Sequence, residues 1–102
     1  MKVVYIAGPY TDKDPAVKAL NIAKAGIYAM QYSMLDFAVI CPHKNNAHFD
    51  LHNEKDTHWI KACKELLSRS DIVVMIPNWT TSSGAVEEYK LAVELGKQII
   101  FE

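Results

Sequence analysis

The sequence predicts an α/β protein: a three-layer, Rossmann- or flavodoxin-like parallel sheet of about four strands with helices on both faces. Short apolar runs alternate with longer segments in which apolar residues recur at helical spacing. The runs have no polar face, which is typical of strands covered by helices on both sides. Glycine or proline follows each of the first three runs. At 102 residues the chain is expected to form one domain that spans residues 1–102.

The individual elements follow from this alternation. The strands are expected at residues 3–7, 37–41, 71–76 and 98–101. The helices are expected at residues 16–32, 57–70 and 84–96. Asp14 and Pro15 supply an N-cap and a first-turn proline for the first helix, and Thr57 can cap the second. The apolar residues at helical spacing in the first helix are Val17, Leu20, Ala23, Ile27 and Met30.

The composition excludes several classes of protein. A net charge of −1 argues against binding to a nucleic acid polymer or to an anionic membrane surface. No apolar run reaches the roughly 20 residues that span a bilayer, and the N-terminus does not have the pattern of a signal peptide. Two cysteines, Cys41 and Cys63, fit a reducing compartment better than a disulfide framework. We therefore expect a cytoplasmic protein.

Glu88 is the most informative residue of the chain. In the helix at 84–96, Glu88 falls inside the apolar arc, between the small residues Ala85 and Ala92, whereas Glu87 lies on the polar side. Burying a carboxylate costs several kcal/mol unless it is paired, protonated or open to a wet cleft. Small neighbours leave room for a ligand to approach. Glu88 is therefore the candidate catalytic residue.

Further candidates for substrate binding follow the strands, because parallel strands end at one edge, where ligands bind. These residues are Gly8, Pro9, Tyr10, His43, Asn78, Trp79, Ser82 and Gly84. Gly8 and Pro9 could form only a tight turn, or Gly8 could let a ligand approach the backbone. Ser82 could simply cap the helix, or belong to an anion site at the helix N-terminus, and both can hold together. Trp79 covers either an edge of the core or a base.

The polar stretch 43–56 shows no periodicity and is expected to be a long loop. His43, His48, Asp50 and His52 occur in it, but their spacing matches no zinc motif. A solvated loop or lid over the site is favoured over a metal site. The sequence has neither a G-x-G-x-x-G fingerprint nor a G-x-x-x-x-G-K-[ST] loop. No metal or cofactor is therefore expected.

Taken together, these motifs resemble the nucleoside 2-deoxyribosyltransferase superfamily, which includes the 2'-deoxynucleoside 5'-monophosphate N-hydrolases. The resemblance covers nearly the whole chain and rests on Y-I-A-G-P-Y at 5–10, D-I-V-V at 71–74 and P-N-W at 77–79. Its specific part is the S-x-G-x-x-x-E element, formed by Ser82, Gly84 and Glu88.

The resemblance implies roles for these residues. The glutamate that matches Glu88 attacks the anomeric carbon of the deoxyribose and forms a covalent deoxyribosyl-enzyme. The serine that matches Ser82 binds a 5'-phosphate in the monophosphate hydrolases, and the segment that matches 8–10 lines the sugar and base pocket. Cys63 stands where the family usually has an aspartate that holds or protonates the substrate. The family pattern also implies a homodimer or higher homo-oligomer, for which the apolar side of the first helix, around Tyr28 and 30–34, is a candidate contact surface.

The leading interpretation is an enzyme that cleaves or transfers the N-glycosidic bond of a 2'-deoxynucleoside or its 5'-monophosphate, with that small molecule as its ligand. One alternative is a non-catalytic module that binds a nucleotide or nucleotide sugar in the same cleft, and Cys63 supports this alternative. Another is a small interaction protein that uses the fold only as a scaffold.

Overall fold

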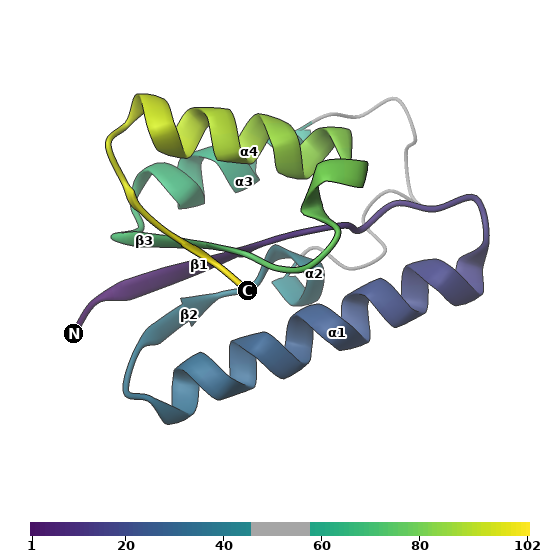
Figure 1. The fold of residues 1–102 in the computed structure, drawn as a ribbon, viewed down its shortest axis with the longest axis horizontal. Coiled ribbons are helices and arrows are strands. Elements are labelled where there is room, and N and C mark those ends of the chain that lie inside the picture. The colour runs from purple at the N-terminus through teal and green to yellow at the C-terminus, as the bar shows by residue number, and fades with distance from the viewer. Residues whose placement is uncertain (46–57) are drawn as a thin grey trace.

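The computed structural model describes residues 1–45 and 58–102. The predicted order of elements is confirmed within this part of the chain (Figure 1). The elements are β1 (Val3–Ala7), α1 (Pro15–Met34), β2 (Ala38–Ile40), α2 (Pro42–Asn45), α3 (His58–Ser68), β3 (Ile72–Met75), the 3-10 turn η2 (Trp79–Thr81), α4 (Ser83–Glu94) and β4 (Gln98–Phe101).

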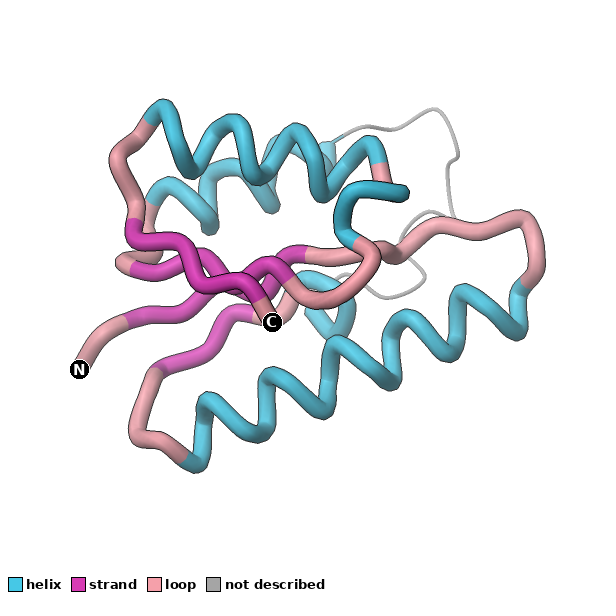
Figure 2. Tube along the Cα trace, in the orientation of Figure 1, coloured by secondary structure: helices cyan, strands magenta, loops and turns pink. Residues whose placement is uncertain are grey.

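The four strands form one parallel sheet in the order β2-β1-β3-β4. Helix α1 covers one face of this sheet, and α3 and α4 cover the other, which confirms the expected three layers (Figures 1 and 2). From β1 the chain adds β2 on one side of the sheet and then β3 and β4 on the other side. The loops after the neighbouring strands β1 and β3 therefore leave the sheet side by side. Such a switch point at the carboxyl edge is where open α/β sheets bind ligands.

The core lies on both faces of the central strands. Towards α1, Val4 and Ile6 pack with Ala25 and Tyr32. On the opposite face, Tyr5 and its neighbours pack against α3 and α4. Every residue of β3 and four of the five residues of β1 are buried, which explains why these strands are continuously apolar.

Helix α1 begins as predicted. The side chain of Asp14 accepts a hydrogen bond from the backbone N–H of Ala16, 2.9 Å away, and Pro15 occupies the first turn. The apolar face that the spacing identified does not pack on the sheet, however. Leu20, Ile27 and the other large members of that face are exposed.

The polar stretch after β2 was predicted to be a loop, and this is wrong for its first residues. Pro42–Asn45 form the short helix α2, in which the backbone N–H groups of Lys44 and Asn45 both donate to the carbonyl of Cys41. Pro42 can start such a turn because it needs no hydrogen bond acceptor. The proposed cap Thr57, together with His48, Asp50 and His52, lies outside the described residues.

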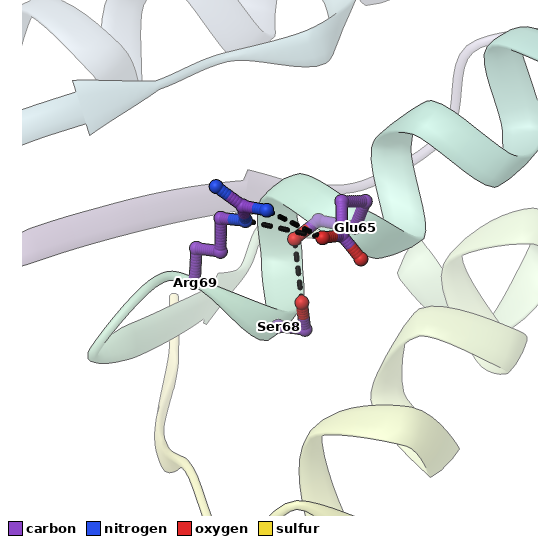
Figure 3. Close-up of polar contacts among 3 residues, drawn as sticks. All are labelled: Glu65, Ser68 and Arg69. Atoms are coloured by element: carbon purple, nitrogen blue, oxygen red, sulfur yellow. Dashed lines mark hydrogen bonds and ion pairs between the residues drawn. The ribbon is translucent and has the colours of Figure 1, made fainter.

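Side-chain hydrogen bonds lie at the C-terminal end of α3, just before β3 (Figure 3). The hydroxyl of Ser68 donates to the carbonyl of Glu65 at 2.6 Å, and the guanidinium of Arg69 donates to the carboxylate of Glu65 at 2.9 and 3.1 Å. Both charged side chains are exposed, so we expect their ion pair to contribute little to stability. Within the described residues, no helix is long and apolar enough to cross a membrane.

Candidate functional site

Glu88 and Tyr5 form the centre of the candidate site. The hydroxyl of Tyr5, on β1, donates a hydrogen bond to Oε2 of Glu88, on the second turn of α4. Tyr5 is completely buried, and Glu88 is half-buried between Ala85 and Ala92, which are both buried. The predicted position of Glu88 on the inner side of α4 is therefore confirmed, while Glu87 is exposed and pairs with Lys90 at 3.6 Å.

Burial makes Glu88 a weak acid. Desolvation raises the pKa of Glu88 to about 7, although the hydrogen bond from Tyr5 and the positive charge of Lys64 both oppose this rise. The pKa of Tyr5 is also raised above its ordinary value, first by burial and then by the charge of Glu88 and the neighbouring Cys63. Tyr5 therefore stays protonated and remains a hydrogen bond donor at any physiological pH.

A cavity of about 520 Å³ opens beside Glu88, on the side of the sheet that α3 and α4 cover. It brings together six of the residues selected from the sequence: Gly8, Tyr10, His43, Ser82, Gly84 and Glu88. The other three, Pro9, Asn78 and Trp79, do not line it. Cys63 and Lys64, from α3, and Glu87, from α4, also line it.

Gly8 is required by the fold itself. A side chain at this position would place its Cβ only 2.2 Å from Cγ1 of Ile76, in the segment after β3. That segment runs close to β1 because the N–H of Ile76 donates to the carbonyl of Ala7. Packing of the buried Ile76 side chain on the backbone of residue 8 thus explains this glycine, without a ligand.

His43 holds the loop after β1. Its Nε2–H donates to the carbonyl of Pro9 at 2.8 Å, and its ring meets the ring of Tyr10 edge-on, with centroids 5.9 Å apart. Burial lowers the pKa of His43, so the ring is neutral at pH 7. Nδ1 is then an acceptor, and it has no hydrogen bond partner among the described residues.

The N-terminus of α4 forms another part of the cavity wall. Ser82 is the N-cap, because its hydroxyl oxygen accepts from the N–H of Ala85 at 3.2 Å. The hydroxyl still has its own proton to donate. Ser83 and Gly84 follow in the first turn, where N–H groups lack an intrahelical acceptor. A Cβ on Gly84 would find no atom closer than 3.9 Å, so packing does not require this glycine.

Trp79 and Asn78 lie away from Glu88. The Trp79 ring stacks at a tilt on Tyr89, with centroids 4.9 Å apart, and contacts Phe101 at 6.0 Å. Trp79 therefore covers an edge of the core, which is one of the two alternatives that the sequence left open. Asn78 adopts a left-handed conformation with φ of 70°, which turns the chain from β3 into η2.

Sequence reasoning missed Tyr5 and Lys64 as parts of the site. Tyr5 occurs in an apolar strand and so resembles a core residue, although its hydroxyl needed a buried partner. Cys63 was correctly predicted to be buried, but it also lines the cavity next to Tyr5. Among the described residues, no group of three or more His, Cys, Asp or Glu side chains could hold a metal ion.

The fold and the site define a class of protein: a small flavodoxin-like domain with a carboxylate of raised pKa, held by a tyrosine, in a cavity at the carboxyl edge of its sheet. The chain belongs to the family described as "Domain of unknown function (DUF4406)", which it matches over residues 2–101. No curated protein matches it.

Proposed function

We propose that this protein cleaves or transfers the N-glycosidic bond of a 2'-deoxynucleoside or its 5'-monophosphate, through a covalent intermediate on Glu88. The observation that carries the proposal is that Glu88 lines the cavity while the buried Tyr5 donates a hydrogen bond to its carboxylate. A structural carboxylate would be placed on the surface or against a cation, because burial without full charge compensation is costly. A carboxylate that is held in a cavity by one donor suits a nucleophile.

The two oxygens of the Glu88 carboxylate would have different roles. Tyr5 donates to Oε2, which leaves Oε1 to attack the anomeric carbon. As the new C–O bond forms, the bond from that carbon to the base breaks, and the base leaves with the electron pair and takes a proton from solvent. Water, or a second base, then attacks the same carbon and releases the carboxylate. When water is the acceptor, its proton goes to solvent and the products are free base and deoxyribose or its 5-phosphate.

The N-terminus of α4 supports the 5'-monophosphate as one form of the substrate. Its first-turn N–H groups and the hydroxyl of Ser82 can donate to an anion, and the helix dipole favours negative charge there. Gly84 has no side chain, so a phosphate can approach the backbone closely. Lys64 also lines the cavity and supplies a positive charge.

A second candidate function is binding of a deoxynucleotide without catalysis. Cys63 favours it, because the resemblance places an acid of the reaction at this position and a thiol is ordinarily a much weaker acid than a carboxyl group. In either case we place the protein in the cytoplasm, since neither Cys41 nor Cys63 forms a disulfide.

Incubation with the four deoxynucleosides and their 5'-monophosphates tests the proposal, with free base measured by chromatography. Wild-type protein should release base from at least one of them, and Glu88→Gln should release it several orders of magnitude more slowly. Glu94→Gln, an exposed carboxylate on the same helix that does not line the cavity, is the matched control and should change the rate by less than about tenfold. A 2-fluoro-deoxynucleoside should add its sugar mass to the peptide that contains Glu88. Binding of these ligands without any release of base would support the second candidate.

A further inference from the structure

Departure of the base is helped by a proton that Glu88 does not supply. When the bond from the anomeric carbon to the base breaks, its electron pair stays on a ring nitrogen, and a heterocyclic anion is a poor leaving group. An acid that protonates the base as this bond breaks accelerates such a step by roughly 10²–10⁴-fold. A group with this role has to reach the cavity that Glu88 lines.

Some protons near the cavity are already engaged. Tyr5 donates its hydroxyl proton to Glu88, and the ring N–H of His43 donates to the carbonyl of Pro9 at 2.8 Å. The hydroxyl groups of serine and threonine are far weaker acids than an ammonium group. Among the described residues that line the cavity, the acidic groups that remain are the phenol of Tyr10, the thiol of Cys63, the ammonium of Lys64 and the carboxyl of Glu87.

Lys64 is the member of this set whose proton transfer leaves no charge behind. Glu88 starts as a carboxylate and becomes a neutral ester when it attacks. A neutral acid such as Tyr10 or Cys63 would therefore end as an anion in the cavity, where desolvation makes a new charge costly. An ammonium group ends as a neutral amine instead.

The positions of the two helices also favour Lys64. Glu88 and Lys64 reach the cavity from α4 and α3, which lie side by side on one face of the sheet (Figure 1). In an in-line displacement the base departs on the side of the anomeric carbon away from the nucleophile, so its acid is best placed on a different element. Glu87 is on the same helix as Glu88, and its ion pair with Lys90 at 3.6 Å shows that it is ionised.

The ammonium group of Lys64 is available for such a transfer. Within residues 1–45 and 58–102 it forms no ion pair or hydrogen bond, and its side chain is exposed. Its positive charge opposes the rise in the pKa of Glu88, so it also favours the ionised form of the nucleophile. Solvent can return a proton to an exposed amine after each turnover.

We infer that Lys64 is the general acid that protonates the leaving base, an assignment that rests on the proposed function. As Glu88 forms its bond to the anomeric carbon, the bond from that carbon to the base nitrogen breaks, and its electron pair takes a proton from the Lys64 ammonium. The cavity then holds an ester, a neutral base and a neutral amine. Lys64 recovers its proton from solvent, which is thus the final source of the proton on the base.

Two forms of one substrate, which differ in how much the base needs a proton, test this role. If wild type releases a purine, the second form carries a methyl group on N7, so the base is already cationic and leaves as a neutral molecule. If wild type releases a pyrimidine, the second form carries fluorine at C5, which stabilises the departing anion. Lys64→Met should lower kcat for the ordinary form by at least about 100-fold, and the loss for the activated form should be at least about tenfold smaller.

Three controls separate a proton donor from a positive charge or a structural residue. Lys64→Arg keeps the charge, but a guanidinium does not give up its proton, so this variant should lose as much kcat as Lys64→Met. Lys61→Met removes an exposed lysine of the same helix that does not line the cavity, and should change kcat by less than about threefold. Added methylamine should restore part of the lost rate to Lys64→Ala, because it can enter the space of the missing side chain.

The possible results distinguish the role of Lys64 from the proposed function itself. Release of base by wild type, together with full activity of Lys64→Met or Lys64→Arg or an equal loss for both forms of the substrate, would overturn the role of Lys64 and leave the proposed function standing. A loss in Tyr10→Phe that is confined to the ordinary form, with Lys64→Met unaffected, would assign the proton to Tyr10. A wild type that releases no base from any deoxynucleoside or monophosphate would overturn the proposed function, and the role of Lys64 with it.

Discussion

Glu88→Gln removes an acid whose ionisation opposes folding at neutral pH. In the unfolded chain Glu88 has its ordinary pKa of 4.5, and in the folded protein burial raises the pKa to about 7. Between these two values the folded state keeps a proton that the unfolded state has lost. The free energy of unfolding of the wild type therefore falls as the pH rises through this window, and the contribution that is fully present below pH 4.5 is lost above pH 7.

The size of the effect follows from the shift. Each pKa unit corresponds to about 1.4 kcal/mol, so a shift of this size gives about 3 kcal/mol. Gln has the same shape, does not ionise and still offers an oxygen to the hydroxyl of Tyr5. The difference in unfolding free energy, variant minus wild type, should therefore increase by about 3 kcal/mol from pH 4.5 to pH 8.

Urea denaturation followed by circular dichroism, at several pH values from 4.5 to 8, measures this difference. Other carboxyl groups titrate equally in both proteins, so their effects cancel. Glu87→Gln, which changes an exposed carboxylate, should give a nearly constant difference across the same range. A difference for Glu88→Gln that is flat, or that decreases with pH, would refute the assignment of a buried carboxylate with a raised pKa.

Other variants test the remaining parts of the site. Gly84→Ala should increase the free energy of unfolding by about 0.5–1 kcal/mol in thermal or urea denaturation, because alanine favours the helix, yet weaken binding of a deoxynucleoside monophosphate in calorimetry; unchanged binding would place the phosphate elsewhere. Gly8→Ala should instead lose stability, because its Cβ would clash with the segment after β3. Tyr5→Phe should move the midpoint of the rise in kcat/KM with pH from about 7 to a higher pH, since its hydrogen bond lowers the pKa of Glu88; a midpoint that stays in place would show that Tyr5 does not act on this carboxylate. Cys63→Ser should reduce stability with little effect on base release, and a large loss of activity would make Cys63 part of the chemistry.

Much of the fold follows from local sequence. The strands were predicted to within one residue at each end because each is a short apolar run, and β1 and β3 are buried on both faces. Asp14 and Pro15 likewise located the start of α1. The short helix α2 was not predictable in the same way, because it is one turn long and has no periodicity to detect.

The candidate site was predictable only where a residue breaks a local pattern. Glu88 could be found because a carboxylate interrupts an apolar arc. Its partner Tyr5 could not, since the sequence does not say which face of β1 meets α4. The sequence also left open whether Trp79 covers the core or a ligand. Its direction depends on the left-handed turn at Asn78, which leads the chain into η2, and the sequence does not reveal this backbone geometry.

The bond between Tyr5 and Glu88 joins residues 83 positions apart, almost the full length of the chain. The candidate site therefore exists only after the first strand and the last helix have both docked on the sheet, and contacts of such long range form slowly during folding. A growing chain on the ribosome has no site until residue 88 has emerged. Fragments that are separated within 46–57 would each carry half of the pair, so recovery of the pair would report their reassembly.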